Sequence, residues 1–237
     1  MLDGFMLRAL LFVILSPLMA FSAASWANLE PFGSWSLDQA VKVLNDSPWA
    51  RRETFTRVIH GVGSGISGEK EIYNTFYVRF LSARPVREAY ARIQQIQYGY
   101  DRMLPHDKRR FEALQSPNLN MDVSRWIVLS VSFRSNDPNE ESAIRRYFQS
   151  ETVETLRTKA YLSTASCPQV ALSAYFPHEE ESVGAKFIFP REVNGVSVIG
   201  RDCPNVILEL LDVPGTESRL CARFEVDPMM VGNRLVY

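Results

Sequence analysis

The sequence has few of the residues that usually hold metals or act as catalytic nucleophiles. Its 237 residues include three histidines and three cysteines, without the H-E-x-x-H motif or the paired Cys/His spacing of zinc sites. The G-x-S-x-G motif of serine hydrolases is absent too. The acidic run His178–Glu181, HEEE, lies between predicted strands, so we expect a solvated turn. No metal or cofactor is therefore expected. A dispersed catalytic triad is recognised only by geometry, so the sequence leaves enzymatic activity open.

The sequence also lacks an excess of charge of either sign. It has 26 Lys and Arg against 27 Asp and Glu, for a formal net charge of −1. Proteins that bind nucleic acids or anionic membranes usually present a basic surface. We therefore expect no nucleic-acid partner. The basic run Asp107–Arg110, DKRR, is expected to be the solvated face of a helix.

The amino-terminal segment is uncharged from Ala9 to Ala27. An apolar run followed by Pro17 and small residues is typical of a cleaved secretory signal peptide. We expect residues 1–27 to be the signal peptide, cut after Ala27 or alternatively after Ala24, and the protein to be exported to the periplasm or the extracellular space. After processing, no stable membrane span is expected. An uncleaved anchor is the other interpretation, since a helix of about 20 apolar residues spans a bilayer.

The odd number of cysteines limits disulfide pairing. Export would permit disulfides, but at least one of Cys167, Cys203 and Cys221 must remain without a partner in the chain. A bridge between Cys167 and Cys203 and a set of three free thiols are both compatible with the sequence.

A glycine-rich segment raises the question of nucleotide binding. Gly63, Gly65 and Gly68 match G-x-G-x-x-G, the fingerprint of dinucleotide-binding loops. Such a loop must lead from a strand into a helix, because the helix N-terminus binds the phosphates. Residues 71–82 alternate in the manner of a strand instead. We therefore expect a β-hairpin that binds no nucleotide, although a glycine-rich loop can also cover a ligand site.

Apolar periodicity predicts the secondary structure of residues 28–164. Ser36 and Gln39 form a capping box, so a helix is expected from Leu37 to about Asn45. The same reasoning predicts strands over 53–60, 71–82 and 125–134, and helices over 85–102, about 106–114 and from 138 onward. Residues 152–162 fit either a helix or a strand.

From residue 165 onward the pattern changes to short strands separated by turns. Strands are expected over 169–176, 183–193, 196–199, 205–212, 220–226 and 231–236. The predicted fold class is α+β: residues 28–164 form a mixed part with amphipathic helices on a sheet, and residues 165–237 form an antiparallel β meander or sandwich. No Pro/Gly/Ser-rich linker separates the two, so one continuous globular unit is expected.

Two packing predictions follow from this pattern. The helix over 85–102 has an apolar stripe that includes Tyr90 and Ile93, and we expect it to cover the apolar face of strands 72–80 and 127–133. Arg79 lies on the opposite face of its strand. A charge at such a position is expected either to reach solvent or to pair with a carboxylate.

The loop after the central strand is the candidate ligand-contact site. Arg134, Asn136 and Asp137 occupy a strand end, where ligands bind in many folds. The alternative is purely structural, because Asp137 precedes Pro138 and can cap the following helix.

Four segments of the chain resemble an uncharacterised family of exported bacterial proteins. They are VLNDSPWARR, the block from GVGSGISG to REAYAR, RSNDPNEES and VGAKFIFPR. The resemblance implies export but no activity and no functional residue. Two hypotheses follow: an exported non-catalytic protein that binds a protein partner or a small ligand in the cell envelope or outside the cell, and a secreted hydrolase with a dispersed catalytic site.

Overall fold

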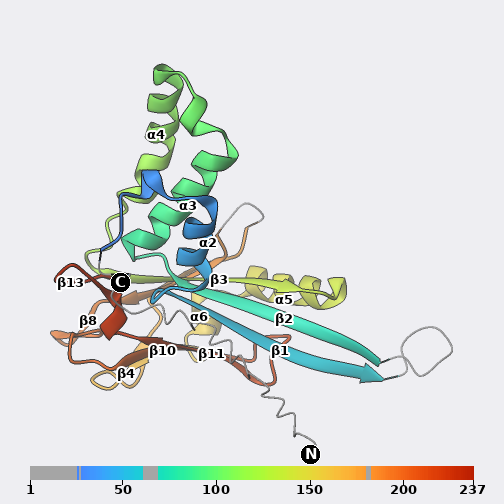
Figure 1. The fold of residues 1–237 in the computed structure, drawn as a ribbon. Coiled ribbons are helices and arrows are strands. Elements are labelled where there is room, and N and C mark those ends of the chain that lie inside the picture. Colours follow the sequence, from blue (N-terminus) through green and yellow to red (C-terminus); the bar gives the residue numbers. More distant parts are fainter. Residues whose placement is uncertain (1–25, 27, 61–68, 180–182) are drawn as a thin grey trace, which may run out of the picture.

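The computed structural model describes residue 26 and residues 28–60, 69–179 and 183–237. The predicted signal peptide, apart from Trp26, and the glycine-rich residues 61–68 lie outside these ranges. The described residues form antiparallel sheets and several helices, which confirms the predicted α+β class. Figure 1 shows helices on one side of one sheet and a second sheet on its other side.

The first sheet has five antiparallel strands. Their order is β1 (Ala50–His60), β2 (Glu69–Phe80), β3 (Trp126–Ser135), β7 (Ala185–Pro190) and β6 (Ala174–Phe176). The β1 and β2 strands pair from Ala50↔Arg79 to His60↔Glu69, so the predicted hairpin is confirmed. The glycine-rich segment leads into a strand and not into the helix that a dinucleotide loop needs.

The second sheet has four strands, in the order β11 (Arg219–Glu225), β10 (Asn205–Leu211), β4 (Ala160–Thr164) and β5 (Val170–Ala171). Two small hairpins complete the β structure: β8 (Glu192–Val193) with β9 (Val196–Ser197), and β12 (Met230–Val231) with β13 (Arg234–Leu235). Each large sheet contains strands from both of the regions 28–164 and 165–237. The two regions therefore share one core.

Some predicted strands have other boundaries in the structure. Residues 169–176 divide into β5 and β6, which belong to different sheets. The prediction of a single strand over these residues is therefore wrong. Residues 231–236 turn back at Gly232, whose φ of 58° allows a tight turn, and form β12 and β13. The ambiguous segment 152–162 contains both the short helix α6 (Val153–Leu156) and the start of β4.

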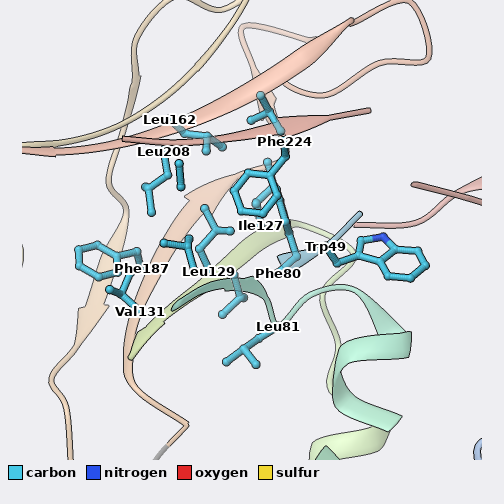
Figure 2. Packing of buried hydrophobic residues seen from close by; sticks show 14 of the residues in the cluster. Trp49, Phe80, Leu81, Ile127, Leu129, Val131, Leu162, Phe187, Leu208 and Phe224 are labelled. Carbon is cyan, nitrogen blue, oxygen red and sulfur yellow. The ribbon is translucent and has the colours of Figure 1, made fainter. Parts of the chain in front are cut away.

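The main core lies between the two sheets. Strand alternation places Phe76, Val78 and Phe80 on the inner face of the first sheet, as predicted. The Phe80 ring meets the Phe224 ring of the second sheet edge to face, with centroids 4.8 Å apart. Figure 2 shows this contact beside buried aliphatic residues of both sheets, which include Leu129, Leu162 and Leu208.

Two helices lie over the outer face of the first sheet, α2 (Leu37–Asn45) and α3 (Arg84–Gln97). The α4 helix (Pro105–Leu119) packs on α3 and projects away from the sheet (Figure 1). The predicted capping box of α2 is confirmed, since Ser36 and Gln39 exchange side-chain to backbone hydrogen bonds. The α3 helix ends before Gly99, which has a φ of 67°, and a separate turn η2 (Tyr100–Arg102) follows. No helix in the described ranges is long and apolar enough to cross a membrane.

The predicted position of α3 is wrong. The apolar inner face packs against the second sheet and the aromatic side of α5 (Pro138–Ser150), where Phe148 contacts Phe133 and Phe187. The α3 helix lies on the opposite face, with Tyr90 beside Arg79. Each sheet has one apolar face, and the two faces pack on one another, so the helices are left to cover the mixed outer face.

The start of β1 is bonded to the carboxyl-terminal part of the described chain. Trp49, which is fully buried, donates from its indole Nε1 to the carbonyl oxygen of Val236 at 2.6 Å. Nearby, Arg51 donates from Nε to the carbonyl oxygen of Arg223 at 2.6 Å. The first strand of the first sheet is thus fixed to the last strand of the second.

The three cysteines are free thiols: Cys203 is buried, Cys167 half-buried and Cys221 exposed. Of the two pairing alternatives, the structure has the one without a bridge.

Candidate functional site

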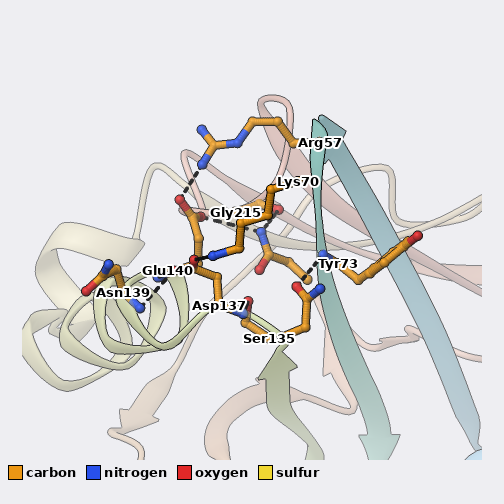
Figure 3. Close-up of polar contacts among 10 residues, drawn as sticks. Arg57, Lys70, Tyr73, Ser135, Asp137, Asn139, Glu140 and Gly215 are labelled. Atoms are coloured by element: carbon orange, nitrogen blue, oxygen red, sulfur yellow. Dashed lines mark hydrogen bonds and ion pairs between the residues drawn. The ribbon is translucent and has the colours of Figure 1, made fainter. Parts of the chain in front are cut away.

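Two of the three predicted contact residues serve the fold itself. The Asp137 carboxylate accepts hydrogen bonds from the backbone N–H groups of Asn139 and Glu140, at 2.9 and 3.1 Å, and so caps α5. It also pairs with Lys70 at 2.6 Å. Figure 3 shows this ion pair together with that of Arg57 and Glu140. The structural alternative therefore accounts for Asp137.

Asn136 is likewise engaged with the backbone of a neighbouring strand. Its Oδ1 accepts from the N–H of Tyr73 at 2.8 Å, and its Nδ2 donates to the carbonyl of Glu71 at 2.9 Å. These bonds extend the pairing of β2 and β3 by one position. The third predicted residue, Arg134, lines a cavity.

Substitution of Asp137 by asparagine should lower the melting temperature at neutral pH. The pKa of Asp137 is lowered by its hydrogen bond to Lys70 and by the N–H of Glu140. A lowered pKa means that the stabilisation is present above the ordinary aspartate pKa of about 3.9 and is lost as the pH falls through the folded-state value. The difference from wild type should therefore shrink in acid, measured by thermal unfolding between neutral pH and pH ~3. Glu192→Gln, at an exposed site, is the control; equal losses in the two variants would contradict the assignment.

A cavity of about 420 Å³ lies on the outer face of the first sheet, next to the edge of β3. The pairing of β3 with β7 ends at Val131, which leaves the last residues of β3 open on that side. The polar wall of the cavity includes Arg79, Tyr90, Ser132, Arg134, Arg145 and His178.

Arg79 is the buried cation of this cavity. Arg79 is 7% exposed. Its guanidinium donates hydrogen bonds to the Leu44 carbonyl at 2.6 Å, to Ser132 Oγ at 2.8 Å and to Asn45 Oδ1 at 2.9 Å. All three acceptors are neutral. No carboxylate of the described residues lies within ion-pair distance. The prediction that Arg79 reaches solvent or pairs with a carboxylate is therefore wrong.

Local structure explains how this charge is held. Strand alternation directs Arg79 to the outer face, where α2 ends against the sheet. The carbonyl of Leu44 belongs to the last turn of α2, whose partial negative charge favours a cation there. The guanidinium of Arg79 lies over the Tyr77 ring, with its carbon Cζ 4.9 Å from the ring centroid. Hydrogen bonds to these neutral partners offset only part of the free-energy cost of removing a charge from water.

The opposite side of the cavity carries Arg145 and His178. The His178 ring lies 5.2 Å from the Phe133 ring, and its Nε2 is 3.3 Å from Nη1 of Arg145. Burial, and then Arg145 and Lys186, lower the pKa of His178, which favours the neutral ring. Since an arginine can only donate, Nε2 accepts and Nδ1 carries the proton. That Nδ1 is buried with no hydrogen-bond partner among the described residues.

His178 was expected to belong to a solvated turn. It is half-buried and lines the cavity instead, because the ring packs on Phe133.

The cavity has an excess of positive charge. Its one described carboxylate, Glu141, already accepts from Arg145 at 3.2 Å and from the backbone N–H of Ser135 at 3.2 Å. Arg134 is exposed, and its side chain makes no hydrogen bond or ion pair with another described residue. Guanidinium groups bind carboxylates and phosphates through paired, charge-assisted hydrogen bonds. The arrangement is suited to an anion.

The same wall contains the three residue types of a hydrolase triad, but they are not connected as one. Ser132 accepts from Arg79, His178 contacts Arg145, and Glu141 contacts Arg145 and a backbone N–H. A triad needs a hydrogen bond from the nucleophile to the base and another from the base to the acid. Neither is present between these three side chains.

Sequence reasoning missed most of this site. Tyr90 was assigned to an apolar stripe and His178 to a turn, while Arg145 received no role. One signal was available: β3 has Ser130 and Ser132 on the face that also receives Arg79. Hydroxyl groups opposite a charged residue, on a face that helices must cover, indicate a buried polar site.

The described residues contain no group of three or more His, Cys, Asp or Glu side chains arranged to hold a metal ion. Comparisons of the chain with protein-family models, with curated proteins and with solved structures give no match.

Proposed function

We propose that the protein is a non-catalytic binding protein for a small anionic ligand, which it holds in the cavity of Arg79. The observation that carries the proposal is a buried guanidinium whose hydrogen-bond partners among the described residues are all neutral. Buried charges in proteins are normally paired. An anionic ligand would supply the missing charge.

Other groups in the cavity support this assignment. Arg134 offers a second guanidinium without a described partner, and His178 offers a buried N–H donor. Burial raises the pKa of Tyr90 while adjacent Arg79 opposes the effect, so the phenol stays protonated at neutral pH and can donate a hydrogen bond. The unconnected Ser132, His178 and Glu141 favour binding over the hydrolase alternative.

The binding test uses acetate, butyrate, sulfate and phosphate as probes. At least one of them should bind the wild-type protein in titration calorimetry and raise its melting temperature. Arg79→Gln should weaken that binding at least tenfold, because loss of one partner of a buried charge pair costs about 2 to 5 kcal/mol. Arg134→Gln, at an exposed position, should weaken binding without loss of stability.

Arg110→Gln is the matched control, since Arg110 is exposed on α4 far from the cavity wall. It should bind the probe as wild type does. Undiminished binding by Arg79→Gln would exclude this cavity as the site, and the failure of every probe to bind would argue against an anion-binding function.

We also propose that the protein is exported, from the uncharged segment Ala9–Ala27. Trp26 packs edge to face on Trp49, with centroids 6.0 Å apart. This contact favours cleavage after Ala24, because cleavage after Ala27 would remove Trp26. The mature protein from its producing cell should then begin at Ser25, as read by amino-terminal sequencing. A start at Asn28 would select the other cleavage site, and an intact amino terminus would contradict processing.

A further inference from the structure

Three side chains form a row across the outer face of the first sheet. Arg79 on β2 is paired with Ser130 on β3, and Ser130 is paired with Lys186 on β7. Directly paired residues point to the same face of a sheet. Adjacent strands are about 4.8 Å apart, so the backbones at Arg79 and Lys186 are separated by about 10 Å. Two cations therefore flank one serine, whose hydroxyl is buried without a hydrogen-bond partner among the described residues.

Lys186 lines a second cavity, of about 240 Å³. Tyr90 and Val183 belong to the walls of both cavities, so the two adjoin. The first cavity holds Arg79 and the second holds Lys186. Between them lies the Tyr90 side chain, which is close to both Arg79 and Ser130.

The second cavity also has positive charge, and none of its described lining residues carries a carboxylate. Arg87 in its wall donates to the carbonyl oxygens of Leu81 and Ser82, both at 2.7 Å, and to that of Leu119 at 3.4 Å. The Lys186 side chain makes no hydrogen bond or ion pair with another residue of the described ranges. The rest of the wall offers amides from Gln94 and Gln115 and apolar surface from Leu81.

We propose that the ligand carries two acidic groups, one bound at Arg79 and the other at Lys186, with a linking chain that passes Tyr90. This inference rests on the proposed function, because it extends the Arg79 site into the adjoining cavity. The spacing selects a class of ligand: a dianion whose acidic groups are several bonds apart, such as a linear dicarboxylic acid. Two adjacent charges on one short molecule would leave Lys186 without a partner.

The test compares dicarboxylates with monocarboxylates of the same length. Suberate should bind the wild-type protein at least tenfold more tightly than octanoate, and more tightly than succinate, in titration calorimetry at constant ionic strength. Both C8 acids bury a similar chain, so the comparison isolates the second carboxylate. Because it uses the wild-type protein, it does not depend on the folding of a variant.

Lys186→Met should then remove the preference for suberate over octanoate, while Lys108→Met on α4 should keep it. Equal affinities for suberate and octanoate, both dependent on Arg79, would overturn the two-group ligand and leave the anion-binding function intact. Absence of binding by every acid, including acetate and butyrate, would overturn both. A suberate preference that persists in Lys186→Met would also overturn the assignment of the second group.

Discussion

Substitution of Phe80 by alanine should reduce the free energy of unfolding by about 3 to 5 kcal/mol, the range for a buried phenylalanine. Phe80 is fully buried at the interface of the two large sheets, where its ring contacts Phe224 edge to face. The alanine would leave a cavity between two flat sheets that cannot close around it, and the aromatic contact would be lost as well. Chemical denaturation of the purified protein measures the loss.

Phe176→Ala is the control for this measurement. Phe176 ends β6 with 52% of its surface exposed, so its removal should change stability by no more than about 0.5 kcal/mol. If the two variants lost similar amounts, the inner face of the first sheet would not be the centre of the core.

The second large effect is expected from Gly184→Ala. Gly184 has a φ of 115°, and a Cβ atom there would lie 2.4 Å from the carbonyl oxygen of Val131. The substitution should cost about 2 to 6 kcal/mol, because the backbone conformation costs about 1 to 3 and overpacking adds about 1 to 3. It should also weaken anion binding, since the displaced backbone of Val131 adjoins Ser132, the acceptor of an Arg79 hydrogen bond.

Gly195→Ala separates the two contributions. Gly195 also has a positive φ, 77°, but a Cβ atom there would meet nothing within 4 Å. Its loss of stability in chemical denaturation should therefore reflect conformation alone, with anion binding unchanged. Losses of the same size in both variants would mean that the contact with Val131 relaxes freely.

Local features of the fold could be predicted from the sequence because they depend on neighbouring residues. The alternation in β2 and β3, the capping box at Ser36 and the Asp137 cap all depend on backbone periodicity or on hydrogen bonds within a few residues. The position of α3 could not be predicted in this way, because an apolar helix face and an apolar sheet face are equally good partners for another sheet face. The division of residues 169–176 between two sheets is another result of distant pairing.

The candidate site could be predicted even less well. Its cationic groups come from β2, β3 and α5. His178, whose Nδ1 has no hydrogen-bond partner among the described residues, comes from the segment after β6. From the sequence, Arg79 is expected either to reach solvent or to pair with a carboxylate. Whether a buried charge has a carboxylate partner depends on which elements meet around it. In the structure, three neutral acceptors surround Arg79 instead.

The contact of Trp49 with Val236 has a consequence for the order of folding. The two residues are 187 positions apart, so this hydrogen bond cannot form until nearly the whole described chain has been made. At a synthesis rate of about 5 to 20 residues per second, Val236 follows Trp49 by roughly 10 to 40 s. For most of that interval the inner face of β2 lacks its partners from β10 and β11, and Trp49 lacks Val236 throughout. Contacts of such long sequence separation also slow refolding, so the chain depends on protection from aggregation before its core closes.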